Sequence, residues 1–121
     1  MAVPITVVDD SKISRKMVIR ALPSSWKVDI TQAENGVEAL AAYRDGKAEI
    51  MFLDLTMPVM DGYETLEHLQ KEALNTFVIV ISADIQPEAQ ARVKKLGAMA
   101  FIKKPVKTTD IENVLREYGI I

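Results

Sequence analysis

Short apolar runs rich in branched side chains alternate with longer segments of helical period along this chain. The clearest runs occupy residues 5–8, 50–53 and 77–81. Runs of this length and composition are typical of strands buried on both faces, as a parallel sheet requires. Residues 26–30 and 99–102 are weaker candidates of the same kind. We therefore expect five strands.

Five other segments carry apolar residues at helical spacing, and each follows one of the expected strands. We expect their buried stripes to consist of Ile13, Met17, Val18, Ala21 and Leu22; Val37, Leu40 and Ala41; Leu66, Leu69 and Ala73; Ala89, Val93 and Leu96; and Ile111, Val114, Leu115 and Tyr118. Pro23, Gly46 and Gly97 are placed to end the first, second and fourth helices. Pro87 suits the start of the fourth, and the spacing of Thr109 and Glu112 predicts a capping box in the last.

Strands alternating with helices in this way indicate an α/β fold with a doubly wound parallel sheet, because right-handed crossovers place helices on both faces. The 121 residues, of which 49% are hydrophobic, suit one domain covering residues 1–121. The chain contains no internal repeat or linker, and the last expected helix ends near Tyr118. We therefore expect no effector domain in this chain.

Charge and composition exclude several classes of function. The net charge is −2 and no basic tract is present, so we expect neither nucleic acid nor a membrane surface as a partner. The absence of cysteine excludes disulfides, thiolate zinc sites and a cysteine nucleophile. No signal peptide or membrane-spanning stretch is recognisable. These features lead us to expect a cytoplasmic protein.

Polar residues follow four of the expected strands. In sheets of this kind, ligands bind beyond the carboxyl ends of the strands, so residues at these positions should converge. They are Asp9 and Asp10 after the first strand, Asp54 to Thr56 after the third, Ser82 to Asp84 after the fourth, and Lys103 to Pro105 after the fifth. The sequence thus predicts three carboxylates, a hydroxyl and a lysine at one edge.

This set of side chains indicates phosphoryl-transfer chemistry. Neighbouring carboxylates raise one another's pKa unless a cation neutralises them, and a small set with open positions suits Mg²⁺ better than Ca²⁺. We expect no fixed countercharge among them, so Mg²⁺ should raise the melting temperature. Lysine and Ser82 then supply a charge and a hydrogen-bond donor for an anion. No glycine-rich phosphate loop is present, which argues against a bound nucleotide and leaves Asp54 as a nucleophile that forms an aspartyl phosphate.

Four motifs, in this order and spacing, carry a family resemblance. They are VVDDS at 7–11, FLDLTMPVMDG at 52–62, VIVISA at 78–83 and FIKKP at 101–105. Together they resemble the receiver domain of two-component response regulators over essentially the whole chain. The resemblance implies a (βα)₅ fold, flavodoxin-like and CheY-like, with strand order 2-1-3-4-5.

The resemblance also implies roles for individual residues. Asp54 would be the phosphoacceptor, and Mg²⁺ would be held by Asp10, Asp54 and the backbone carbonyl of Thr56, with Asp9 acting mainly through water. Lys104 would contact the phosphoryl oxygens, and the bond before Pro105 is often cis in the family. Ser82 and Phe101 would take the two switch positions, Ser82 moving to the phosphoryl group while Phe101 rotates inward.

The partners that the resemblance implies are a sensor histidine kinase or phosphotransfer protein and a downstream target. The target would bind the face formed by the fourth helix, the fifth strand and the fifth helix, and an auxiliary phosphatase is also conceivable. The chain would be a stoichiometric phosphoacceptor that promotes its own phosphorylation and dephosphorylation, not an enzyme. We expect a stand-alone regulator of the chemotaxis type.

Other interpretations stay open at this stage. Asp9, Asp10 and Ser11 alone could cap the first helix, Ser82 could be a turn hydroxyl, and Phe101 could be an ordinary core aromatic. The chain could also be a receiver excised from a larger regulator, or a degenerate receiver that acts only as a scaffold. A Mg²⁺-dependent phosphohydrolase with an aspartyl nucleophile needs similar chemistry, but such enzymes place the nucleophile in D-x-D after the first strand, where this chain reads VVDDS.

Overall fold

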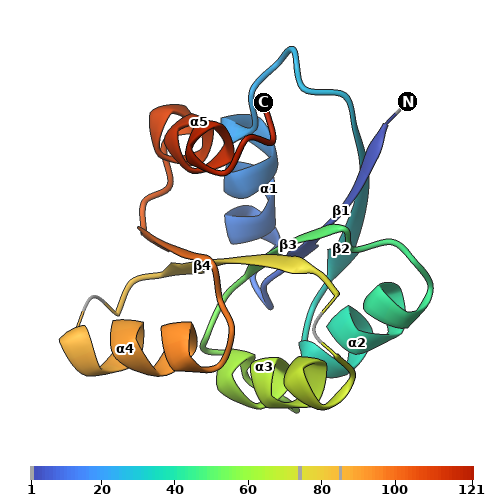
Figure 1. Cartoon of the computed structure of the whole chain (residues 1–121), viewed down its shortest axis with the longest axis vertical. Coiled ribbons are helices and arrows are strands. Elements are labelled where there is room, and N and C mark those ends of the chain that lie inside the picture. The colour runs from blue at the N-terminus through green and yellow to red at the C-terminus, as the bar shows by residue number, and fades with distance from the viewer. Residues whose placement is uncertain (1, 74, 85) are drawn as a thin grey trace.

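The chain folds around a five-stranded parallel sheet in the order β2-β1-β3-β4-β5 (Figure 1). A computed structural model describes residues 2–73, 75–84 and 86–121. The strands are β1 (Val3–Val8), β2 (Val28–Ala33), β3 (Ile50–Leu53), β4 (Phe77–Ser82) and β5 (Ala100–Lys103). The predicted α/β class, strand number and strand order are confirmed.

Helices cover both faces of the sheet (Figure 1). They are α1 (Lys12–Ala21), α2 (Gly36–Arg44), α3 (Gly62–Lys71), α4 (Pro87–Lys95) and α5 (Thr108–Glu117). Figure 1 shows α1 and α5 on one side of the sheet and α2, α3 and α4 on the other. This is the two-sided arrangement that right-handed crossovers produce.

Each face of the sheet has its own hydrophobic core, because successive strand residues point to opposite faces. Phe52 and Ile79 pack with Ile111 and Leu115 of α5, whereas Leu53 and Val80 pack with Leu66 and Leu69 of α3. All four residues of β3 are buried, as expected for a central strand. Burial on both faces explains why the central strands β3 and β4 lack polar alternation.

The strand register aligns the ends of the central strands. Val8 of β1 pairs with Leu53 of β3, which in turn pairs with Val80 of β4. The next residues along β1 and β3 are Asp9 and Asp54, so the register alone makes these two acids neighbours. The polar residues predicted for this edge therefore meet because the strands end at the same level.

Several predicted boundaries and stripes are wrong. The strand predicted at 26–30 lies at Val28–Ala33, and the one predicted at 99–102 begins and ends one residue later. In α1, Ile13 and Met17 are 72% and 46% exposed, and Arg15 is buried instead. Other stripe residues that lie on the surface are Val37, Ala41, Ala73 and Tyr118.

Helix ends are partly as predicted. Pro23 follows the end of α1, Pro87 begins α4, and Gly46 and Gly97 follow α2 and α4 with positive φ. Ala73 lies beyond the end of α3, with φ of 70°. The predicted capping box is also wrong: Thr109 lies inside α5, and the carboxylate of Asp110 accepts from the N–H of Lys107 at 3.3 Å.

Among the described residues, no helix is both long and apolar enough to cross a membrane.

The loop between β3 and α3 contains a strained residue. Val59 has φ of 69° and is 80% exposed, and the N–H of Met60 donates to the carbonyl of Pro58 at 2.7 Å across it. This bond closes a γ-turn of the strained, positive-φ kind. A β-branched side chain is poorly suited to this region, whereas asparagine is enriched there.

Replacing Val59 with asparagine should stabilise the fold. We expect Val59→Asn to raise the free energy of unfolding by about 1 kcal/mol, because it relieves the left-handed strain without removing a buried contact. Val37→Asn is the matched control, since Val37 is exposed in α2 and has no positive φ. Urea unfolding of both variants checks this; an equal effect of the two substitutions would rule out backbone strain as the cause.

Candidate functional site

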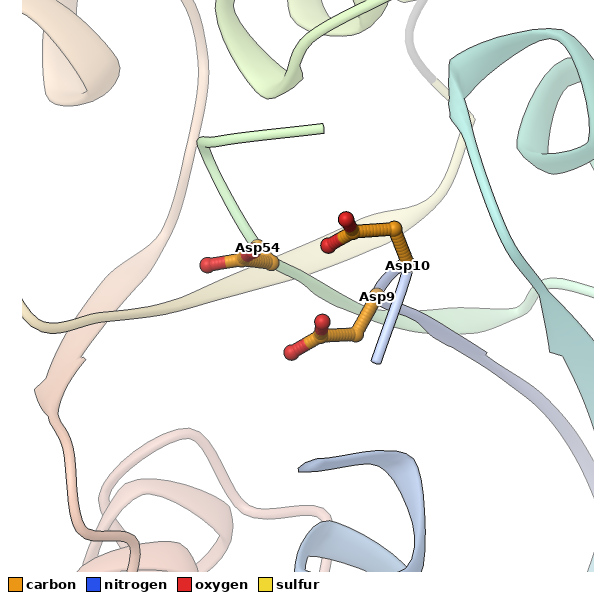
Figure 2. Close-up of side chains that lie close together, drawn as sticks. All are labelled: Asp9, Asp10 and Asp54. Carbon is orange, nitrogen blue, oxygen red and sulfur yellow. The ribbon is translucent and has the colours of Figure 1, made fainter. Parts of the chain in front are cut away.

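Three carboxylates meet at the carboxyl edge of the sheet (Figure 2). One carboxylate oxygen from each of Asp9, Asp10 and Asp54 lies within 4.8 Å of the others. Figure 2 shows all three side chains pointing to the same side from the ends of β1 and β3. Asp9 and Asp54 are buried, whereas Asp10 is exposed. This pattern provides closely spaced oxygen atoms of the kind that hold a hard divalent cation.

Hydrogen bonds fix both the backbone and the carboxylate of Asp9. Its N–H donates to the carbonyl of Ala33 at 3.0 Å, and its Oδ1 accepts from the N–H of Ser11 at 2.9 Å. Its Oδ2 accepts from the Nζ of Lys104 at 3.0 Å. Both carboxylate oxygens of Asp9 therefore have protein partners, which leaves Asp10 and Asp54 freer to bind something else.

Lys104 joins the cluster from the end of β5. Its Nζ lies 3.0 Å from Asp9 and 3.4 Å from Asp54. Burial opposes the charge of Lys104, but its hydrogen bond to Asp9 and the charges of both acids prevail and raise its pKa. The expectation that the acids lack a fixed countercharge is wrong, because Lys104 already pairs with two of them. The peptide bond between Lys104 and Pro105 is cis, the form that the resemblance implies.

Asp54 is in an unfavourable place for a charge. Burial and then the negative charge of Asp9 raise its pKa, and the nearby Lys104 and the N–H of Leu55 offset this only in part. The ionised form of Asp54 is therefore destabilised in the folded chain. Binding of a further cation beside Asp54, or a covalent change that removes its negative charge, would therefore be favoured.

The loop after β3 folds back tightly against Asp54. The N–H of Gly62 donates to the carbonyl of Leu55 at 2.9 Å. A Cβ atom at Gly62 would lie 2.5 Å from the backbone oxygen of Asp54, so only glycine fits. Thr56 lies on this loop and its side chain is exposed.

Ser82 is the last residue of β4, and Phe101 lies within the neighbouring strand β5. The buried Oγ of Ser82 accepts from the N–H of Asp84 at 3.1 Å, which is the turn role considered above. The N–H of Lys104 donates to the carbonyl of Ser82 at 2.9 Å, which ties the ends of the two strands together. Phe101 is half-buried against the core on the α4 side.

The helix-capping interpretation applies to Ser11 alone. Its Oγ accepts from the N–H of Ser14 at 3.2 Å and caps α1. Asp9 and Asp10 instead join Asp54. Our sequence interpretation missed Arg15, which is buried directly behind this loop. Its spacing of three residues from Val18, which is buried on the same helix, was the available signal.

Comparisons with known proteins agree with this site. A model of the response regulator receiver domain family matches residues 5–116. The chain is 34% identical over 111 residues to the chemotaxis protein CheY of Listeria monocytogenes, covering 92% of this chain and 93% of that protein. The signal receiver domain of the response regulator NarL from Mycobacterium tuberculosis superposes with a TM-score of 0.86 at 29% identity, covering 98% of this chain and 97% of that domain.

A longer relative also matches. The chain is 38% identical over 104 residues to protein-glutamate methylesterase/protein-glutamine glutaminase 3 of Geobacter sulfurreducens, a match that covers 85% of this chain and 28% of that protein. These matches favour a receiver over the phosphohydrolase alternative. The chain belongs to the response regulator receiver domain family, whose members are the phosphoacceptors of two-component signalling.

Proposed function

We propose that Asp54 accepts the phosphoryl group, taking it from a phosphohistidine on a sensor kinase or phosphotransfer protein. An Asp54 oxygen forms a bond to phosphorus while the bond between phosphorus and the histidine nitrogen breaks. The electron pair of the broken bond stays on that nitrogen, which takes up a proton from water as the imidazole leaves. Hydrolysis later returns the carboxylate and releases phosphate. The observation that carries this proposal is the position of Asp54, a buried carboxylate flanked by the two acids that follow β1 and by Lys104.

The acidic cluster fits Mg²⁺. Three carboxylate oxygens lie close enough to share one ion, and burial together with the negative charge of Asp9 raises the pKa of Asp54, so a cation beside this carboxylate would be favourable. In this proposal Asp10, Asp54 and the backbone carbonyl of Thr56 would hold the ion. Asp9 would act through water, which is consistent with the protein partners that both of its oxygens already have. Bound Mg²⁺ would neutralise charge on the carboxylates and on the incoming phosphoryl oxygens.

The remaining residues would respond to the phosphoryl group. Lys104 would shift its ion pairing from Asp9 toward an oxygen of the phosphoryl group carried by Asp54. The Oγ of Ser82 accepts from Asp84, so its own proton is available for donation to a phosphoryl oxygen. Movement of Ser82 would let Phe101 rotate inward, which changes the surface beside α4.

We infer that a downstream target binds the face formed by α4, β5 and α5. A hollow on this face is lined by Ala91 and Lys94 of α4, by Phe101 of β5, and by Tyr118 after α5. The similarity to the chemotaxis protein CheY of Listeria monocytogenes favours a chemotaxis-type regulator. The chain would act as a stoichiometric acceptor that promotes its own phosphorylation and dephosphorylation. An auxiliary phosphatase would act on the same aspartyl phosphate.

Loss of the Asp54 carboxylate should abolish phosphorylation. We expect Asp54→Asn to gain no phosphoryl mass from acetyl phosphate with Mg²⁺, because an amide is not a nucleophile here. Asp61→Asn is the matched control: Asp61 is an exposed cap of α3, and asparagine caps equally well. Intact-mass spectrometry checks both variants, and labelling of Asp54→Asn at the wild-type level would overturn the assignment.

The same substitution should stabilise the metal-free protein. Because the folded-state pKa of Asp54 is raised, its ionised form opposes folding above that pKa, and the opposition fades as the pH falls through it. We therefore expect Asp54→Asn to raise the melting temperature in EDTA at about pH 7, and to raise it less at about pH 4. Thermal melts at both values measure this. A lower melting temperature of Asp54→Asn than of the wild type at neutral pH would contradict this, because it would mean that the ion pair with Lys104 stabilises ionised Asp54 more than burial and the repulsion from Asp9 destabilise it.

A further inference from the structure

Arg15 is a charged residue enclosed in the interior, and none of the roles above uses it. It lies in α1, and only 7% of its surface is exposed. Arginine is rarely buried to this degree unless its guanidinium is paired and hydrogen-bonded. The contacts of this group therefore indicate what it is there to hold.

The guanidinium joins α1 to the ends of two strands. Its Nη1 donates to the backbone carbonyl of Asp9 at 2.7 Å, and its Nε donates to the side-chain Oε1 of Gln32 on β2 at 2.8 Å. Among the residues that the structure describes, the carboxylate within ion-pair distance of the guanidinium is that of Glu34, 3.9 Å from Nη2 on a side chain that is 64% exposed. The short contacts thus go to a peptide carbonyl and an amide, and Arg15 is not one more cation paired with the acidic cluster.

The carbonyl that Arg15 binds belongs to the peptide between Asp9 and Asp10. A peptide unit is planar, so fixing its oxygen also fixes the direction in which the next residue leaves. Asp9 has further anchors in Ala33, Ser11 and Lys104. The side chain of Asp10 is exposed, so its direction depends mainly on this peptide.

We propose that Arg15 is a positioning residue for the metal site. By holding the Asp9–Asp10 peptide, it keeps the Asp10 carboxylate turned toward Asp54 before any ion binds, and Gln32 keeps the guanidinium in place. Mutation of groups that orient metal ligands in this way typically lowers metal affinity by about ten- to a hundredfold. This inference rests on the proposed Mg²⁺ site and deepens it.

Positioning and simple electrostatics predict effects of opposite sign. Removing a positive charge close to a cation site should strengthen Mg²⁺ binding if charge alone matters. Removing the group that orients Asp10 should weaken it. A role for Arg15 in helix packing alone would change the stability of the fold and leave Mg²⁺ affinity unaltered.

The test compares Arg15→Met, Arg15→Lys and Lys16→Met with the wild-type chain. Methionine fills similar space without donors, whereas lysine can donate to the Asp9 carbonyl without also reaching Gln32. Lys16 is exposed on the same helix, so its substitution removes a neighbouring charge without touching the loop. Thermal melts in EDTA establish that each variant is folded, and isothermal titration calorimetry measures Mg²⁺ affinity.

We expect Arg15→Met to weaken Mg²⁺ binding about tenfold, Arg15→Lys to be intermediate, and Lys16→Met to match the wild type or bind slightly tighter. Phosphorylation by acetyl phosphate gives a second readout. The half-saturating Mg²⁺ concentration should rise about tenfold in Arg15→Met, while the rate at saturating Mg²⁺ stays within about threefold of wild type, since Asp54, Lys104 and Ser82 are unchanged.

Wild-type or tighter Mg²⁺ affinity in a folded Arg15→Met would overturn the inference, as would an equal loss in Lys16→Met. If Arg15→Met does not fold, Arg15→Lys decides: intermediate affinity supports the positioning role and wild-type affinity overturns it. Failure of the proposed metal site looks different, because the wild type itself would then bind no Mg²⁺.

Discussion

The burial of two like charges side by side is the constraint on which this site depends. The parallel register pairs Val8 with Leu53, so Asp9 and Asp54 must be neighbours wherever β1 and β3 end together. Both acids are buried, and burial together with repulsion raises the pKa of Asp54. Lys104 relieves the repulsion only partly, at 3.0 Å from one acid and 3.4 Å from the other. The fold therefore builds a site that is deficient in positive charge.

Because positive charge is deficient at this site, the three acids have different roles. Asp9 uses both carboxylate oxygens within the protein, which makes it part of the scaffold more than a free ligand. Asp10 is exposed and Asp54 is costly to ionise, so these two gain most from a bound cation. Arg15 donates to the backbone carbonyl of Asp9 and so fixes the peptide before Asp10 through the main chain and not through a carboxylate. Rigid support of this kind is what an exposed ligand requires for a fixed geometry.

Much of the fold could be predicted because its strands are buried on both faces, and buried runs such as 50–53 have a clear composition. The position of the edge strand β2 was predicted wrongly because half of its residues are exposed and half are polar. The buried face of α1 was predicted wrongly because Ile13 and Met17 are apolar but lie on the surface, as apolar side chains often do. Arg15 was overlooked because charged residues are seldom buried. The gathering of acids at one edge of the sheet could be predicted from where the strands end. The ion pair between Lys104 and Asp9 could not, because it joins residues 95 positions apart and depends on geometry that no local pattern contains.

We propose that this edge of the sheet binds Mg²⁺ and that Asp54 accepts a phosphoryl group there. The most direct test is site mapping of the wild-type chain by mass spectrometry after treatment with acetyl phosphate, in Mg²⁺ and in EDTA. We predict a single acyl phosphate on the peptide that contains Asp54, formed in Mg²⁺ and nearly absent in EDTA. Labelling at another residue, equal labelling in EDTA, or continued turnover of acetyl phosphate without a covalent species would contradict the account.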